Sequence, residues 1–362
     1  MLPEWHAQLA IIITWPHQYS DWHSMLDTIE ACYIDIALAI TESQKLLIIA
    51  YNQSHQENII KKLNNNKINI TNISFVIIPT NDTWVRDYGP ITVGNKHNNQ
   101  LIWQDFEFNA WGGKFDSQLD NSVNKKLIKH EWFNENYLLE KQNYILEGGS
   151  IEVNSHGDLL TTASCIDNTN RNNANGKNIN RKNINRKNIK LQQKEMFENI
   201  LGSKNIYKLN HGTLSGDDTD GHIDTLVRFM NDNLVCYVGC NNKLDEHYLS
   251  LSKMKKEIDS LPFDAISLPM PEAQYNKNNY RLPATYANFL ITNYNILVPI
   301  YNCKQDNIAL DIFKNCFKNK NIIPIDCSAL IYQHGSLHCS TMQVPLLSTT
   351  ENINKNTSES YI

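Results

Sequence analysis

Residues 287–301, Ala-Asn-Phe-Leu-Ile-Thr-Asn-Tyr-Asn-Ile-Leu-Val-Pro-Ile-Tyr, contain two apolar runs placed back to back. The runs cover 287–293 and 295–301, and they meet around Asn293, Tyr294 and Asn295. Two β-rich runs joined this directly are typical of a hairpin, which belongs to a mixed or antiparallel sheet. The pairing therefore weighs against a doubly wound parallel sheet.

The rest of the chain has many short β-rich runs and few helical segments, which predicts an α/β fold with small mixed sheets. The predicted strands are 11–15, 46–51, 73–79, 91–93, 144–153, 159–164, 225–230, 234–239, 265–269, 287–300 and 321–326. Helical spacing of apolar residues occurs near 20–42, 54–64, 191–201, 243–259 and 306–318. No Gly-x-Gly-x-x-Gly or Walker A pattern is present, so dinucleotide-binding and P-loop folds have no support.

Composition excludes several classes of protein. The chain has 362 residues, of which 41% are hydrophobic and 20% charged, as in ordinary globular proteins. Its net charge of −5 gives no excess of basic residues to hold a nucleic acid. The longest apolar runs, 46–51 and 296–301, are far too short for a membrane helix. Because the first residues do not resemble a signal peptide, we expect a cytoplasmic protein.

An asparagine-rich tract at about 168–190 has a composition that cannot form a core, and we expect an exposed insertion loop there. Its basic residues could also contact an acidic partner. Residues 349–362 are polar and are expected to form a tail. The eight cysteines include no Cys-x-x-Cys pair, which argues against a disulfide scaffold or zinc ribbon.

Four polar segments stand where strands are expected to end, which is where scaffolds commonly present functional groups. They are Trp-Val-Arg-Asp-Tyr-Gly-Pro at 84–90, Leu-Glu-Gly-Gly at 146–149, Asp-Asp-Thr-Asp-Gly-His-Ile-Asp at 217–224, and His-Gly-Ser-Leu-His-Cys-Ser-Thr at 334–341. The third could be a cation site, because carboxylates are ligands for hard cations, but it does not fit an EF-hand loop. If it were a strand, His222 and Asp224 would share one face.

Cys339 has neighbours that suggest catalysis. A nearby imidazole such as His222 can activate a thiol and protonate a leaving group. Structural roles stay open for each candidate: Cys339 as a buried thiol beside a solvent-facing His338, Asp87 in a surface ion pair with Arg86, and Glu147 as a turn residue. The residues alone do not decide between these interpretations.

Together the four segments resemble the agmatine deiminase family, which includes bacterial-type peptidyl-arginine deiminases and belongs to the pentein superfamily of guanidino-modifying enzymes. That family has Trp-x-Arg-Asp-x-Gly-Pro, Glu-Gly-Gly, Gly-His-x-Asp and His-Cys-x-Thr in this order, as found here at 84–90, 147–149, 221–224 and 338–341. Further matches, Phe-Asn-Ala-Trp-Gly-Gly, Thr-Thr-Ala-Ser-Cys and Pro-Ala-Thr-Tyr-Ala-Asn-Phe, extend the resemblance over nearly the whole chain. Departures flank Cys339, and Asp220 replaces a usual asparagine.

The resemblance implies a five-bladed α/β propeller of ββαβ units around a central pocket, as one catalytic domain over 1–348. It implies that Asp87 and Asp224 bind a guanidinium and that Cys339 attacks its carbon. His222 would transfer protons and be oriented by Glu147. Trp84 and Trp111 would line the channel for the substrate chain. No metal or organic cofactor is implied, and a homodimer is a candidate assembly.

Several functions compete at this point. Hydrolysis of agmatine to N-carbamoylputrescine and ammonia, a step of putrescine metabolism, is the leading interpretation, and a peptidyl-arginine deiminase is the nearest alternative. A free-arginine enzyme would need a cation to bind the substrate carboxylate. Arg86, Arg228 and Arg281 are available, but we expect them in internal ion pairs instead. A metal-dependent hydrolase built on the aspartates of 217–224, and a binding protein without activity, are the remaining classes.

Overall fold

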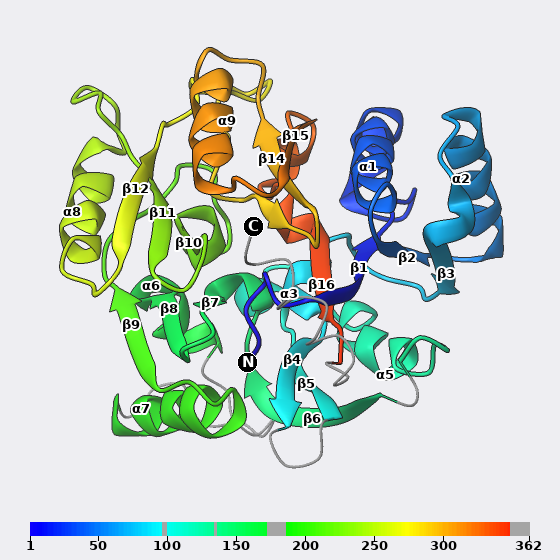
Figure 1. Cartoon of the computed structure of the whole chain (residues 1–362), viewed down its shortest axis with the longest axis horizontal. Helices are drawn as coiled ribbons and strands as arrows, with labels where there is room; N and C mark the ends of the chain where they lie inside the picture. The colour runs from blue at the N-terminus through cyan, green and yellow to red at the C-terminus, as the bar shows by residue number, and fades with distance from the viewer. Residues whose placement is uncertain (96–99, 134–135, 172–185, 348–362) are drawn as a thin grey trace.

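The computed structural model describes residues 1–95, 100–133, 136–171 and 186–347. It contains five small sheets arranged around a common centre (Figure 1). Four sheets have three strands with the same pattern: the first strand runs antiparallel to the second, and the third runs parallel to it. The strands of these sheets are β4 (Ile91–Asn95), β5 (Gln100–Glu107) and β6 (Tyr137–Ile145); β7 (Ile151–Val153), β8 (Asp158–Thr162) and β9 (Asn205–Leu209); β10 (Val227–Phe229), β11 (Leu234–Val238) and β12 (Asp264–Leu268); and β13 (Leu290–Ile291), β14 (Asn295–Ile300) and β15 (Asn321–Asp326).

The fifth sheet joins the two ends of the described chain. Its order is β16 (Thr341–Pro345), β1 (Gln8–Thr14), β2 (Lys45–Ala50) and β3 (Ile73–Ile77). β16 runs antiparallel to β1, and β2 runs parallel to it, so the pattern of the other sheets recurs here with an added strand. The ring of sheets is therefore closed by a pair of strands from opposite ends of the sequence.

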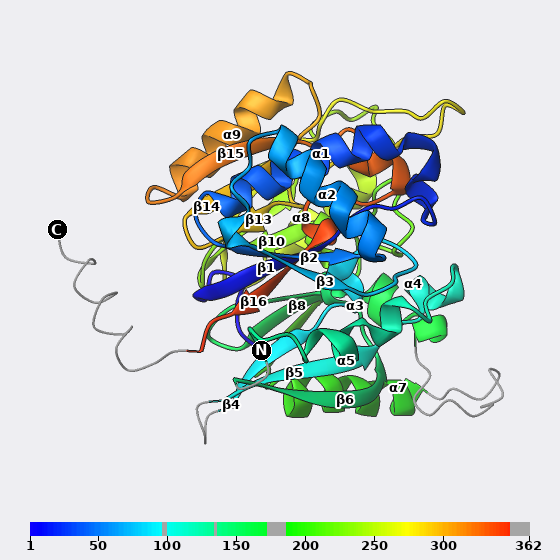
Figure 2. The same ribbon diagram turned by 90° about the vertical axis from the view of Figure 1, so that its right-hand side faces the viewer.

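A helix connects the second and third strands of each unit, which makes the unit ββαβ. These connecting helices are α1 (Leu26–Thr41), α5 (Val123–Leu127), α7 (Arg186–Lys194), α8 (Tyr248–Ile258) and α9 (Gln305–Cys316). An additional helix, α2 (Gln53–Asn65), connects β2 to β3. The remaining α-helices are one turn long: α3 (Val85–Tyr88), α4 (Ala110–Gly113) and α6 (Ala163–Ile166). The connecting helices lie outside the sheets, with α9 and α7 at opposite ends of the molecule in both views (Figures 1 and 2).

The main core lies between these helices and the sheets. Strands β1 and β2 are buried on both faces, which explains their continuous apolar runs. In α1 the buried residues Ile29, Tyr33, Ile36 and Ile40 follow the helical spacing of three and four that turns one face inward. A smaller cluster, which includes Phe106, lies between the sheets of β4 and β7.

The hairpin expected around 293 is confirmed, with Leu290 opposite Leu297 and Ile291 opposite Ile296, although its first strand is only two residues long. The α/β fold with small mixed sheets is confirmed as well. Three strands were not predicted: β5, β9 and β16. The run expected at 144–153 is divided between β6 and β7 by the turn at 146–150.

The asparagine-rich tract is described only in part. Residues 172–185 of it, and 349–362 of the expected tail, lie outside the described residues. At its start Thr169 and Asn170 are exposed, whereas Arg171 is buried, and the insertion loop as a whole stays a prediction. The division into one domain over 1–348 stays a prediction. Among the described residues, no helix combines the length and the apolar composition needed to cross a membrane.

Candidate active site

The four polar segments meet at the centre of the ring. A pocket is lined there by Trp84, Asp87, Trp111 and Cys339, among other residues. Asp87 comes from α3, Glu147 from the turn after β6, and Cys339 from the short 3-10 helix His338–Ser340 before β16. Asp87 and Cys339 are 252 positions apart in sequence, so only the closed ring brings them to the same pocket.

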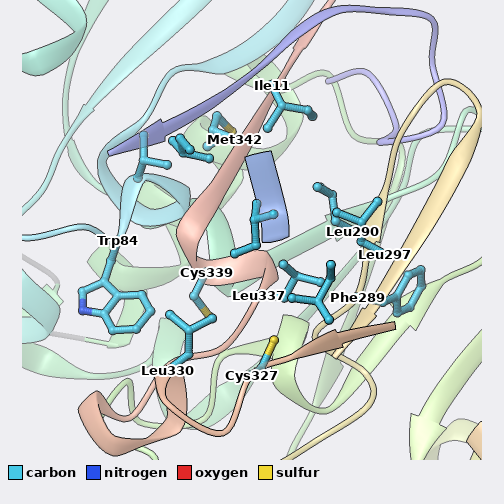
Figure 3. Packing of buried hydrophobic residues seen from close by; sticks show 14 of the residues in the cluster. Ile11, Trp84, Phe289, Leu290, Leu297, Cys327, Leu330, Leu337, Cys339 and Met342 are labelled. Carbon is cyan, nitrogen blue, oxygen red and sulfur yellow. The ribbon is translucent and has the colours of Figure 1, made fainter. Parts of the chain in front are cut away.

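Cys339 lies at the bottom of the pocket with apolar residues on one side and polar ones on the other. Figure 3 shows its side chain near Trp84, Leu330 and Leu337. Its Sγ is 3.8 Å from Asp224 Oδ2, and Asn288 Nδ2 donates to it at 3.3 Å. Burial raises the pKa of the Cys339 thiol well above its usual range, and the carboxylates of Asp224 and Asp87 raise it further. These effects favour the neutral thiol over the thiolate in the site.

Asp87 is held by two donors. Its Oδ1 accepts from the Gly149 backbone at 3.0 Å, and its Oδ2 accepts from Trp111 Nε1 at 2.9 Å. Burial raises the pKa of Asp87 to about 6, and the nearby carboxylates of Asp224 and Glu147 raise it too. Above that pH it presents a buried negative charge to the pocket.

Asp224 is the second carboxylate beside Cys339. His338 Nδ1 lies 2.7 Å from its Oδ2, and His338 Nε2 lies 2.6 Å from Glu4 Oε2 on the other side. Burial opposes ionisation, but the hydrogen bond and charge of His338 lower the pKa of Asp224. Its Oδ1 is buried and has no hydrogen-bond partner among the described residues.

His222 and Glu147 form a buried pair. His222 Nε2 lies 2.9 Å from Glu147 Oε2, and its Nδ1 lies 3.6 Å from Asp87 Oδ1. Burial lowers the pKa of His222, but Asp87 and Glu147 outweigh it and raise that pKa well above its usual value. Within the described part of the chain, Nδ1 is buried without a hydrogen-bond partner. The imidazolium can therefore offer one proton toward the centre of the site.

Gly149 makes the close arrangement possible. A Cβ at this position would lie 2.6 Å from His222 Nδ1, 2.8 Å from Asp87 Oδ1 and 3.1 Å from Asp224 Oδ2. Since real Cβ atoms do not approach that closely, a side chain here would push the three groups apart. Gly149, two residues after Glu147, is thus part of the site.

The two tryptophans form a wall of the pocket. Trp84 stacks at a tilt on Trp22, with ring centroids 5.7 Å apart. Trp111 lies in a left-handed turn, with φ of 54°, that directs its indole N–H to Asp87. Both residues line the pocket, and their role in a channel for an alkyl chain stays a prediction.

Several interpretations that the sequence left open do not hold in the structure. His222 and Asp224 do not share the face of a strand, because residues 223–225 form a 3-10 helix and the strand begins at 227. His338 is buried rather than solvent-facing, since it joins Glu4 to Asp224. Asp87 is not in a surface ion pair, and Glu147 is fully buried rather than an ordinary turn residue.

The arginines considered for a substrate carboxylate are used inside the protein. Arg228 Nη2 lies 2.9 Å from Glu4 Oε2, and Arg228 also pairs with Glu152. Arg281 Nη2 lies 2.9 Å from Asp245 Oδ2. Arg86 Nη2 lies 3.6 Å from Glu4 Oε2. These positions support the internal ion pairs that we expect from the sequence.

Sequence reasoning missed three neighbours of the site. Asn288 accepts from the backbone N–H of His338 at 2.9 Å and donates to Cys339 Sγ. His338 supports Asp224, and Arg171 binds Glu147. Asn288 is part of the Pro-Ala-Thr-Tyr-Ala-Asn-Phe match, which was the available signal. Arg171 had no such signal, because it stands at the start of the asparagine-rich tract.

The aspartates of 217–224 do not gather into a cation site. Asp217 accepts from the Gly221 backbone at 2.7 Å, Asp220 pairs with Arg171 and Lys114, and Asp224 faces His338. Glu147, Cys165 and His222 do offer ligand atoms within 4.8 Å of one another. This cluster is poorly suited to a metal ion, because the Arg171 guanidinium already supplies a positive charge to Glu147.

Comparison with known proteins identifies the family of the chain. Residues 1–345 match the family described as Porphyromonas-type peptidyl-arginine deiminase. The chain belongs to this family. It is 30% identical over 95% of its length, and 94% of the other chain, to a putative agmatine deiminase of Legionella pneumophila. The match spans the whole ring of sheets and all four segments.

Solved structures of the family show the same fold. An agmatine deiminase of C. jejuni, as a Cys-to-Ser variant with substrate bound, is 39% identical with a TM-score of 0.85 over 96% of each chain. A putative peptidyl-arginine deiminase is 36% identical with a TM-score of 0.84, over 96% of this chain and 98% of that one. The resemblance to the agmatine deiminases and the pentein-type α/β fold are thereby confirmed.

Proposed function

We propose that the protein is an agmatine deiminase that hydrolyses the guanidinium of agmatine to a ureido group and ammonia. The observation that carries the proposal is a pair of buried polar atoms without partners beside one thiol. His222 Nδ1 and Asp224 Oδ1 have none among the described residues, and Cys339 Sγ lies 3.8 Å from Asp224 Oδ2. Buried polar atoms are rarely left unpaired. A guanidinium N–H would donate to Asp224 Oδ1, and the Nδ1–H of His222 would stay available for the nitrogen that leaves.

The first half of the reaction needs the cation. A guanidinium bound between Asp87 and Asp224 offsets the charges that keep the Cys339 thiol protonated, so that the thiolate can form. The thiolate attacks the guanidinium carbon and forms a C–S bond. His222 gives a proton to the leaving nitrogen, the C–N bond breaks, and ammonia departs. An amidino-thioether remains on Cys339.

The second half restores the thiolate. Neutral His222 takes a proton from a water molecule, whose oxygen attacks the same carbon. The C–S bond then breaks, its electron pair returns to sulfur, and the ureido product leaves after its remaining O–H proton has passed to solvent, where it protonates the released ammonia. One water is consumed and one ammonia released. Glu147, fixed on Nε2, keeps Nδ1 of His222 directed to the centre for both proton transfers.

The pocket favours a substrate with a second cation over one with a carboxylate. Asp21, Asp82 and Asp218 line it in addition to Asp87, and no arginine or lysine is among its described lining residues. These carboxylates suit the ammonium end of agmatine, whereas free arginine would bring its carboxylate among them. The net charge of −5 likewise supports a small cationic substrate rather than a nucleic acid.

A peptidyl-arginine deiminase is the second candidate, because the family description itself names that activity. The test is formation of ureido product from agmatine, free arginine and an arginine-containing peptide in parallel, with Cys339→Ala as control. We expect turnover of agmatine alone and none in the variant. Preference for the peptide would move the assignment to protein deimination, and activity in Cys339→Ala would overturn the thiol mechanism.

A further inference from the structure

Arg171 lies directly behind the Glu147–His222 pair. Its Nε donates to Glu147 Oε1 at 2.9 Å and to Oε2 at 2.8 Å. Its Nη1 donates to Asp220 Oδ2 at 2.6 Å, and its Nη2 donates to the Thr219 carbonyl at 2.8 Å. The side chain is 4% exposed. The guanidinium is thus held on several sides in a site from which water is largely excluded.

We propose that Arg171 is a positioning residue for proton transfer, which fixes Glu147 against His222 and limits how tightly that carboxylate holds the imidazolium proton. The inference rests on the proposed function, because it concerns the same His222 that donates and then recovers a proton. It also gives the beginning of the asparagine-rich tract a role in the site.

The reason lies in how one carboxylate is shared. Glu147 Oε2 faces both His222 Nε2 at 2.9 Å and Arg171 Nε at 2.8 Å. A buried carboxylate with His222 as its only cation would hold the imidazolium proton strongly, and a group that must release that proton would then act slowly. The Arg171 charge on the same carboxylate weakens its pull on His222. The contact to both oxygens also prevents rotation of the carboxylate.

The charge of Asp220 has the opposite effect to that of Arg171 on the pKa of His222. Its carboxylate is 32% exposed and pairs with Arg171, with Lys114 Nζ at 3.0 Å from its Oδ1. Loss of its charge leaves the positive charge of Arg171 less balanced, which lowers the pKa of Glu147 and reduces the elevated pKa of His222. Loss of the Arg171 charge does the reverse and raises the pKa of His222.

The other charged or titratable groups around the pair stay in place in both cases. Asp87 Oδ1 faces His222 Nδ1 at 3.6 Å, and Cys165 Sγ lies 3.8 Å from Glu147 Oε2. Asp224 and Asp218 also influence His222 from the same loop. Opposite shifts from the two substitutions would therefore come from Arg171 and Asp220, and general damage to the site would not produce them.

The test compares Arg171→Gln, Arg171→Lys and Asp220→Asn in the full chain. Two readouts are used: the pH at which kcat for agmatine falls on the alkaline side, and the titration of the His222 imidazole followed by nitrogen-15 NMR. For Arg171→Gln we expect kcat to fall about tenfold with KM nearly unchanged, and both pH midpoints to rise by about one unit. For Asp220→Asn we expect both midpoints to fall. Arg171→Lys keeps the charge, so its midpoints stay near those of the unmodified protein.

Arg281→Gln is the matched control, because Arg281 also binds both oxygens of one carboxylate, Asp245 at 3.0 and 2.9 Å, and is not among the described residues that line the active-site pocket. We expect it to leave both midpoints unchanged. Shifts of the same sign in Arg171→Gln and Asp220→Asn, or none in either, would overturn the proposal. If Arg171→Gln does not fold, Asp220→Asn decides: a downward shift supports the inference and an unchanged midpoint refutes it. Without any agmatine turnover the proposed function fails, whereas the NMR titration still tests Arg171.

Discussion

Gly149 sets the spacing between His222, Asp87 and Asp224, so its replacement tests the site without removing any functional group. Its φ lies outside the left-handed region, and alanine fits its backbone. The added Cβ would lie 2.6 Å from His222 Nδ1. We expect Gly149→Ala to lower kcat/KM at least about 100-fold, because displacement of reacting groups by about 1 Å has that effect.

The matched control for this substitution is Gly94→Ala. A Cβ there would meet only Leu2 Cδ2 at 3.7 Å, which is ordinary contact. Steady-state kinetics and thermal unfolding of both variants make the comparison. An active Gly149→Ala protein, with kcat/KM within about tenfold of the parent, would mean that the three groups do not act together on the substrate.

The pKa of Asp87 predicts how binding depends on pH. Burial raises this pKa to about 6, so the carboxylate loses its charge as the pH falls through that value. We expect KM for agmatine to rise about tenfold per pH unit below about pH 6, because only the ionised form binds the guanidinium strongly. Initial rates between pH 5 and 8 measure this. A constant KM over that range would exclude Asp87 as a charged ligand.

For single residues, the motifs of the sequence were enough to identify the candidate site residues, but they did not reveal which other side chains support them. Cys339, His222, Glu147, Asp87 and Asp224 each stand in a short recognisable pattern. The support from Arg171 and His338 is visible only in the folded ring, because it joins positions 24 and 114 apart. Nothing local distinguishes a buried arginine from a solvated one in a polar tract.

Among the elements, α4 is a left-handed turn rather than an ordinary helix. Ala110, Trp111, Gly112 and Gly113 all have positive φ. Asn109 caps the turn by accepting from the Gly112 N–H at 2.9 Å, and a Cβ on Gly112 would lie 3.0 Å from Asn170 Cβ. The turn therefore places Trp111 between Asp87 and the start of the asparagine-rich tract.

Gly112→Ala and Gly113→Ala form a matched pair. Both have positive φ, so each is expected to destabilise the protein by about 1 kcal/mol. Only the first also presses on Asn170, since nothing lies within 4 Å of a Cβ on Gly113. We expect Gly112→Ala to raise KM for agmatine several-fold more than Gly113→Ala, about threefold or more. Equal KM values in the two variants would show that this contact does not hold Trp111.

The elements also show why some strands were predicted and others not. The hairpin of β13 and β14 is encoded locally, because both runs and their turn lie within 287–301. β16 has the sequence Thr-Met-Gln-Val-Pro, which lacks a strong strand pattern, and it becomes a strand because β1 pairs with it. β9 is buried only at its last residue, and it likewise becomes a strand through its partner, which is β8.

For the whole molecule, Glu4 links the N-terminal segment to the centre. Its Oε2 contacts Arg228 and His338, and its Oε1 accepts from the Ile291 N–H at 2.7 Å. Burial opposes ionisation, but Arg228 and His338 hold the pKa of Glu4 well below its usual range. Its stabilising effect is thus present at neutral pH and is lost as acid protonates it.

We expect Glu4→Gln to lower the free energy of unfolding by about 3 kcal/mol at pH 7, because buried cations lose their counter-charge. The difference from the parent should shrink as the pH is lowered into the acidic range. Glu246→Gln is the control: Glu246 is 56% exposed in its pair with Arg281, and we expect a change below about 1 kcal/mol. Thermal and denaturant unfolding measure both. Equal effects of the two variants would contradict a stabilising role of the Glu4 network.

The pairing of β16 with β1 also bears on how the chain folds during synthesis. β1, with the sequence Gln-Leu-Ala-Ile-Ile-Ile-Thr, emerges from the ribosome early, and its partner emerges only after residues 15–340 have been made. Until then one edge of an apolar strand has no neighbour, which is the kind of surface that promotes aggregation. A nascent chain should therefore depend on chaperones until the ring closes, and enzymatic activity should appear only at that last step.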